Sequence, residues 1–170
     1  EGGLADNAAV MSWRGEEGGI EAASQNHNVV MTPNPNCYFD HYQSSAYEPL
    51  AIGGLTTMDE IYNWSVIPHE LAPDKHHFVL GAQANVWTEY IPTPEHAEYM
   101  IFPRLCALAE KVWTNESVQN FTSFTNRMDF HYHRLDAKGI NYRIPYPKLD
   151  AQGIFLNANE KLVLEKEIAS

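Results

Sequence analysis

Three short clusters in this sequence combine an aromatic side chain with polar or acidic neighbours. They are Ser12-Trp13-Arg14-Gly15, Cys37-Tyr38-Phe39-Asp40 and Trp87-Thr88-Glu89. An aromatic ring can cover the apolar C–H face of a sugar, and a carboxylate can accept hydrogen bonds from its hydroxyls. In an extended segment, alternation would point Tyr38 and Asp40 to one side, and likewise Trp87 and Glu89. The pattern therefore indicates a carbohydrate-binding site.

Structural roles compete with this interpretation. Trp13 fits a place in the core as well as a place in a site, and Tyr38 could be a core tyrosine with a satisfied hydroxyl. Asp40 and Glu89 are harder to explain structurally. A carboxylate beside bulky aromatic residues is costly unless it is paired or takes part in function.

Apolar runs predict the strands that position these clusters. The runs cover residues 8–13, 29–32 and 78–84, the last continuing to Trp87. Residues 19–25 are compatible with a helix between the first two strands, and the spacing fits a parallel crossover. Each cluster follows a strand end, which is where α/β folds place their active sites. The sequence therefore predicts an α/β fold with a parallel sheet.

Helices are predicted mainly in the second half of the chain. The hydroxyl, proline and acid at 93–95 favour a helix start, and Pro103 should kink this helix or begin a second one. A final helix is expected over 117–138, closed by Gly139. Trp64 and Trp113 lie at helical or post-helical positions, so we expect both to serve packing.

Composition excludes several classes of partner. The chain has 170 residues and a formal net charge of −11, which argues against nucleic acid because phosphate binding needs clustered Lys and Arg. No apolar stretch approaches the roughly 20 residues that span a bilayer. Cys37 and Cys106 lack the spacing of metal ligands and read as small buried hydrophobic residues. We expect no metal and no cofactor.

The motifs around these clusters resemble a known family. Residues 80–89 (LGAQANVWTE) and 102–114 (FPRLCALAEKVWT) are similar to the signature region of the bacterial β-N-acetylhexosaminidases of glycoside hydrolase family 20. Residues 10–15 (VMSWRG) and 37–43 (CYFDHYQ) match the two preceding strand ends. The resemblance covers roughly residues 1–145.

The resemblance implies part of a larger fold. The family folds as an eight-stranded (β/α)8 TIM barrel, and the strands here would be its sixth, seventh and eighth, with outer helices. Three parallel strands cannot close such a barrel, so strands one to five would come from an upstream half-barrel, in the same protein or a second chain. Residues 1–145 would be the carboxyl-terminal half of the barrel. Residues 146–170 would be a linker and the truncated start of a β-rich accessory domain.

The resemblance also implies a mechanism. In this family the substrate's own 2-acetamido oxygen attacks the anomeric carbon with retention, assisted by an adjacent Asp–Glu pair. Tyr38 would donate its hydroxyl to the acetamido oxygen, and Asp40 and Glu89 would hold ring hydroxyls. Trp13 and Trp87 would wall the pocket.

The sequence departs from the family pattern in two respects. The catalytic Asp–Glu pair follows the fourth strand of the barrel, which would lie upstream of Glu1. The pairs Glu16-Glu17 and Asp59-Glu60 are not replacements, because both read as solvated charges at helix starts. Many members also have a tryptophan in the loop near residues 52–54, where this chain has Ile-Gly-Gly.

The first functional hypothesis is a fragment of an exo-acting hexosaminidase that releases terminal N-acetylglucosamine or N-acetylgalactosamine from glycans. This fragment alone should be inactive. The alternative is a non-catalytic N-acetylhexosamine-binding remnant. A third hypothesis is that the chain is part of an unrelated α/β barrel; the motif around Trp87 argues against it. By analogy with the family, we expect a periplasmic, cell-surface or secreted protein.

Overall fold

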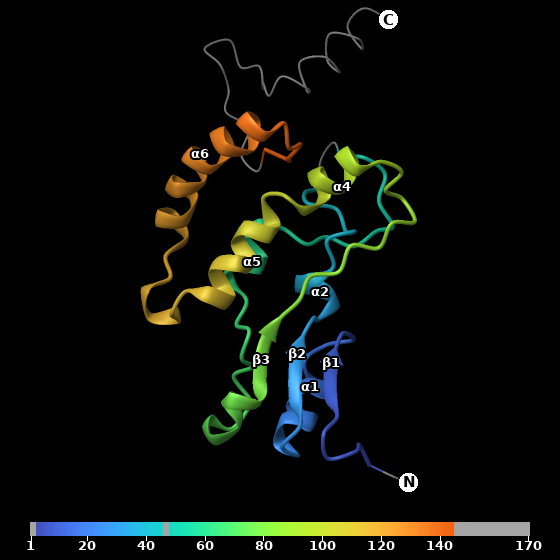
Figure 1. Cartoon of the computed structure of the whole chain (residues 1–170), viewed down its shortest axis with the longest axis vertical. Coiled ribbons are helices and arrows are strands. Elements are labelled where there is room, and N and C mark those ends of the chain that lie inside the picture. Colours follow the sequence, from blue (N-terminus) through green and yellow to red (C-terminus); the bar gives the residue numbers. More distant parts are fainter. Residues whose placement is uncertain (1–2, 46–47, 145–170) are drawn as a thin grey trace, which may run out of the picture.

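A computed structural model describes residues 3–45 and 48–144 of the chain, which form a small parallel sheet with helices around it (Figure 1). The strands are β1 (Ala9–Ser12), β2 (Asn28–Met31) and β3 (Val79–Ala82), hydrogen-bonded in the order β1-β2-β3. Both pairings are parallel, with Val10 opposite Val29 and Val30 opposite Gly81. The three predicted strands and the parallel crossover are confirmed.

Helix α1 (Glu17–Ser24) makes the crossover and covers one face of the sheet. Val29 and Met31 point into this layer and are fully buried. Ser12 fixes the entry to α1, because its hydroxyl donates to the Gly15 carbonyl at 2.7 Å and accepts from the Gly19 amide at 3.0 Å. The helix therefore approaches the sheet at a residue without a side chain.

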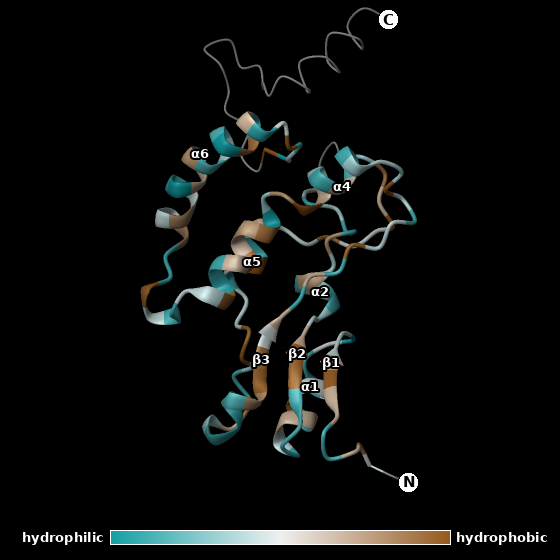
Figure 2. Cartoon of the chain, viewed as in Figure 1, coloured by the Kyte–Doolittle hydropathy of each residue, from teal (hydrophilic) through white to brown (hydrophobic). Residues whose placement is uncertain are grey.

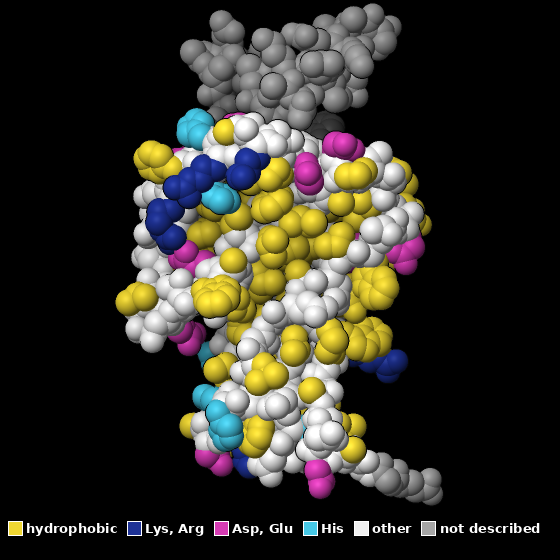
Figure 3. All heavy atoms as spheres, in the orientation of Figure 1, with side chains coloured by type: hydrophobic (Ala, Val, Ile, Leu, Met, Phe, Trp, Pro, Cys, Tyr) yellow, Lys and Arg dark blue, Asp and Glu magenta, His cyan; other side chains and the backbone are white. Residues whose placement is uncertain are grey.

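The opposite face of the sheet, turned toward the viewer in Figure 1, is open in the described part of the chain. Alternation along β1 places Met11 on this face, and continues to Trp13; both side chains are 48% exposed. The same side of the molecule carries many apolar side chains in the space-filling view (Figure 3). Within the described residues, β1 and β3 each have one neighbouring strand, so their outer edges are unpaired.

The other elements follow the strands. They are α2 (Asn34–Cys37), α3 (Met58–Asn63), the 3-10 helix η1 (Pro73–Phe78), α4 (Pro94–Ile101), α5 (Arg104–Trp113), the 3-10 helix η2 (Glu116–Val118) and α6 (Phe121–Lys138). Pro103 separates α4 from α5, as the sequence predicts. The last helix begins later than predicted, because the Asn120 side chain caps it by accepting from the Ser123 amide at 2.8 Å. Gly139 closes it with φ +66°.

The core lies between the covered face of the sheet and the helices. Apolar residues concentrate in the strands, whereas α6 alternates between apolar and hydrophilic positions (Figure 2). Phe124 and Met128 of α6 are buried in this core, and so is Trp64, which confirms its packing role. The packing prediction for Trp113 is wrong, since its side chain is 88% exposed.

Two further expectations concern the C-terminal residues 146–170 and membrane-spanning segments. The proposed linker and β-rich segment at 146–170 lies outside the described residues. Among the residues that are described, no helix has the length and apolar character needed to cross a bilayer.

The close approach of α1 to the sheet gives a prediction with a matched control. A Cβ at Gly19 would lie 2.7 Å from Met31 Sδ and 3.1 Å from Ser12 Cβ, whereas a Cβ at Gly18 would meet nothing nearer than 3.6 Å. Alanine usually stabilises a helix interior by about 1 kcal/mol over glycine, but overpacking costs roughly 1–3 kcal/mol. We therefore expect Gly18→Ala to raise the free energy of unfolding and Gly19→Ala to lower it.

Urea unfolding of the purified variants measures this difference in the free energy of unfolding. Equal stabilisation by both substitutions would show that α1 does not pack against the sheet at Gly19.

Candidate active site

Hydrogen bonds beyond the strand ends bring the three predicted clusters to one end of the sheet. The carbonyl of Trp13 accepts from the Asn34 amide at 2.8 Å, which joins the segment after β1 to α2. After α2, the chain pairs again with the continuation of β3, through a bridge between Tyr38 and Asn85. Trp87 follows Asn85 by two residues. The clusters therefore share the carboxyl end of the strands, toward which α2 lies in Figure 1.

Asp40 lies in a turn rather than in an extended segment. The His41 amide donates to the Tyr38 carbonyl at 3.4 Å, so the predicted alternation of Tyr38 and Asp40 is wrong. The sequence reading missed α2, which interrupts the strand before the turn. Asp40 is only 4% exposed, and its Oδ1 has no hydrogen-bond partner among the described residues. A buried carboxylate oxygen of this kind is a strong acceptor for a donor that comes from outside the chain.

Tyr38 is half-buried and rests against His41, with ring centroids 5.8 Å apart. His41 Nδ1 lies 3.1 Å from Thr56 Oγ1, which fixes the imidazole. Gly54 has φ +69°, and a Cβ there would lie 2.6 Å from the His41 ring, so the loop approaches at a residue that needs to be glycine. Burial lowers the pKa of His41 below its usual 6.5, although Asp40 opposes this shift. The imidazole that backs Tyr38 is therefore neutral at pH 7.

The remaining predicted residues are exposed at the open side of this end. Trp13 is 48% and Trp87 55% exposed, and the Arg14 guanidinium lies 4.9 Å from the Trp13 ring centroid. Trp13 is therefore not a core residue. Glu89 is exposed in a turn in which the Ile91 amide donates to Thr88. The side chains of Trp13, Trp87 and Glu89 are therefore exposed and can contact a ligand.

Arg104, at the start of α5, is fully buried directly beneath the Asp40 turn. Its guanidinium donates to the carbonyls of Phe39, His41, Thr56 and Met100 at 2.5–3.1 Å. Burial lowers the pKa of the guanidinium to about 9, while the carboxylates of Glu48 and Asp40 oppose the shift. Nothing in the local sequence predicts a role for this arginine, although it lies within the 102–114 motif.

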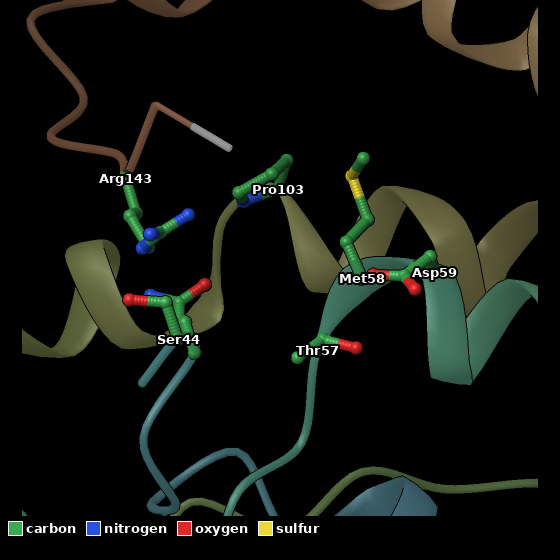
Figure 4. Close-up of a pocket in the computed structure, with 7 residues that line it drawn as sticks. Ser44, Thr57, Met58, Asp59, Pro103 and Arg143 are labelled. Atoms are coloured by element: carbon green, nitrogen blue, oxygen red, sulfur yellow. The ribbon is translucent and has the colours of Figure 1, made fainter. Parts of the chain in front are cut away.

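Glu48 anchors the loop after the Asp40 turn. Its side chain is 3% exposed; it pairs with Arg143 and accepts from the Ser44 hydroxyl at 2.8 Å and the Tyr99 hydroxyl at 2.8 Å. Beside this cluster lies a pocket of about 150 Å³, in which Arg143 and Ser44 face Met58 and Asp59 (Figure 4). None of the five predicted site residues lines this pocket, so it is not the predicted sugar site.

The two acidic pairs have structural roles. Thr57 and Glu60 form a capping box at the start of α3, and Asp59 is exposed in its first turn, as predicted. Glu16 differs from its prediction as a solvated charge, because its Oε1 accepts from Trp64 Nε1 at 2.6 Å. Glu16 is bound to Trp64 and Glu60 to the cap of α3, so neither pair is arranged as the family's catalytic pair.

Metal and thiol chemistry find no support in the described residues. No group of three or more His, Cys, Asp or Glu side chains there is arranged to hold a metal ion. Burial raises the pKa of Cys37 to about 12 and that of Cys106 to about 11, so both thiols stay protonated at neutral pH. They behave as small apolar residues, as the sequence suggests.

Comparison with known proteins places the chain in a family. The model of the glycosyl hydrolase family 20 catalytic domain matches residues 2–116. A beta-hexosaminidase of Porphyromonas gingivalis is 51% identical over 150 residues, which are 87% of this chain and 19% of that protein. A beta-N-acetylhexosaminidase of Cellulomonas fimi is 29% identical over 125 residues, 72% of this chain and 25% of that protein. The chain thus spans a quarter or less of the length of these relatives.

Solved structures agree. An exo beta-N-acetylglucosaminidase from Vibrio harveyi, in complex with N-acetylglucosamine, matches with a TM-score of 0.73 and 31% identity over 84% of this chain and 23% of that one. A Streptomyces plicatus N-acetyl-beta-hexosaminidase, 24% identical over 88% of this chain and 30% of its own, has the same fold with a TM-score of 0.73. The parallel strands and their helices are part of a TIM barrel, as predicted. The chain belongs to glycosyl hydrolase family 20.

Proposed function

We propose that the protein to which this chain contributes is a glycoside hydrolase that releases terminal N-acetylhexosamine by a retaining, substrate-assisted mechanism. One observation carries the proposal: among the described residues, Oδ1 of the buried Asp40 has no hydrogen-bond partner, and Asp40 follows Tyr38 at the same end of the sheet as the exposed Trp13 and Trp87. The family membership supports it, as does the N-acetylglucosamine bound by the Vibrio harveyi relative.

Each residue has a role that its surroundings suit. Tyr38, backed by a neutral His41, donates its hydroxyl to the acetamido oxygen and steadies it for attack on the anomeric carbon. Asp40 and Glu89 accept hydrogen bonds from ring hydroxyls. Trp13 and Trp87 cover the apolar faces of the sugar and exclude water. The protein supplies no nucleophile in this reaction, because the substrate's own acetamido group serves as one.

The general acid has to come from elsewhere. Neither acidic pair of the described residues is free for this role, since Glu60 is engaged in the cap of α3 and Glu16 with Trp64. We propose that an upstream half-barrel, in the same protein or in a second chain, supplies the Asp–Glu pair. Its strands would pair with the outer edges of β1 and β3 and cover the open face that carries Met11. A periplasmic, cell-surface or secreted location remains part of the proposal.

The second candidate function is a non-catalytic protein that binds N-acetylhexosamine. It uses the same aromatic and acidic residues, and the exposure of Trp13 and Trp87 favours it equally. It differs in one measurable respect, because it requires affinity without turnover.

Activity of the chain alone and of a completed barrel separates these candidates. The completed barrel fuses the upstream portion of the Porphyromonas gingivalis relative to this chain, in place of the matching 150 residues. We expect the chain alone not to hydrolyse a chromogenic N-acetylglucosaminide, and the completed barrel to hydrolyse it at a rate comparable with that of the parent relative. A folded completed barrel that binds N-acetylglucosamine without turnover would support the binding protein instead. Turnover by the chain alone would place an acid within it.

Substitutions in the completed barrel test the carboxylates. A hydrogen bond to a charged group contributes about 1.5–3 kcal/mol, so Asp40→Asn and Glu89→Gln should each lower kcat/KM roughly 10- to 100-fold. Asp59→Asn is the matched control, because this exposed acid lies at the start of α3 and should leave kcat/KM unchanged. An unchanged kcat/KM in Asp40→Asn would remove the role given to Asp40, and a large loss in Asp59→Asn would restore the Asp59-Glu60 pair as a catalytic candidate.

A further inference from the structure

The buried guanidinium of Arg104 holds the peptide backbone on both sides of Asp40. Its Nη2 donates to the carbonyl of Phe39 at 2.5 Å, and its Nη1 donates to the carbonyl of His41 at 3.1 Å. These residues directly precede and follow Asp40 in the chain. The arginine therefore fixes the position and tilt of the Asp40 backbone without a hydrogen bond to its carboxylate.

The arrangement uses every donor that an arginine has. Nε and Nη2 both donate to Met100, at 3.1 and 2.6 Å, and Nη1 also donates to Thr56 at 3.0 Å. An arginine carries five N–H donors in a fixed planar fork, and all five are satisfied here. The plane also stacks near the Phe39 ring, with Cζ 4.8 Å from its centroid. Lysine, with one ammonium on a flexible stem, cannot reproduce these directions.

Thr56 holds the same turn from its other side. Its hydroxyl donates to the Pro35 carbonyl at 3.0 Å and lies 3.1 Å from His41 Nδ1, while its own amide donates to the Tyr42 carbonyl at 2.9 Å. Thr56 and Arg104 are both completely buried. The turn is therefore clamped between the 54–56 segment and the first residue of α5.

A buried cation held only by carbonyls is expensive, since each desolvated charge costs several kcal/mol. The nearest ionised groups that offset the charge of Arg104 are Glu48 and Asp40, and neither forms an ion pair with it among the described contacts. The cation attracts the Asp40 carboxylate electrostatically, while the Oδ1 of this carboxylate has no hydrogen-bond partner among the described residues.

We propose that Arg104 is a positioning residue for substrate recognition, which acts through Asp40 by holding the carbonyls on either side of it. The inference rests on the proposed function, in which Asp40 accepts a hydrogen bond from the sugar. Arg104 itself is fully buried and does not touch the substrate.

A double-mutant cycle in the completed barrel tests the proposal. Because an ångström-scale misplacement of a contact can cost about 100-fold, Arg104→Lys should lower kcat/KM roughly 10- to 100-fold when Asp40 is present. If Arg104 acts through Asp40, the same substitution in the Asp40→Asn background should cost less than about threefold. Calorimetric binding of N-acetylglucosamine should show the same coupling. Equal losses in both backgrounds would overturn the proposal and leave Arg104 a structural residue.

Two further variants keep the test decisive. Arg127→Lys is the matched control, because Arg127 is an exposed α6 arginine paired with Glu110 and should not affect kcat/KM. If Arg104→Lys does not fold, Thr56→Val loosens the same turn while keeping the carbonyl that Arg104 binds. Its effect, expected at about threefold or more, should also disappear in the Asp40→Asn background; an effect that persists there would contradict the proposal. If Asp40→Asn alone has no effect, the proposed function of Asp40 fails, which is a separate result.

Discussion

Parallel pairing of β2 with both of its neighbours is the constraint on which the rest of the structure depends. In a parallel sheet all carboxyl ends lie at the same edge, so the segments after β1, β2 and β3 must meet there. The pairing resumes beyond α2 at Tyr38 and Asn85, which carries the register of the sheet into the candidate site. A side-chain hydrogen bond of 2.9 Å from Asn85 to Thr32 ties the two strand ends once more. The sheet therefore brings together the turns and loops that carry the candidate site residues.

Two buried charged side chains, Glu48 and Arg104, support the region around the carboxyl end of the sheet. Glu48 pairs with Arg143, near the end of the described chain, and Arg104 joins the start of α5 to the Asp40 turn. Both connect segments far apart in sequence. Gly53 and Gly54 lie outside the helices and strands, and the Glu48 and Arg104 side chains anchor the chain on either side of the Asp40 turn.

Local patterns in the sequence predicted the strands, most helices and the shared edge, because these depend on apolar runs and caps near each residue. These predictions failed where contacts between residues far apart in the sequence determine the structure. The strand predicted over 29–32 is followed by Pro33 and Pro35; proline is tolerated in the first turn of a helix, and the unpredicted helix α2 forms there. Arg104 was missed because an arginine on an amphipathic helix is usually exposed, and its acceptors Phe39 and His41 lie more than 60 residues away. The packing role predicted for Trp113 was wrong because helical spacing alone does not show whether another element packs against that face of the helix.

The most direct test of the central claim, that these strand ends form a sugar-binding site, is a crystal structure of the completed barrel with N-acetylglucosamine. The sugar should lie at the carboxyl ends of β1, β2 and β3, with a ring hydroxyl within about 3 Å of Asp40 Oδ1 and the acetamido oxygen at the Tyr38 hydroxyl. A sugar bound elsewhere, or one at this end that leaves Asp40 and Tyr38 without contact, would contradict the claim.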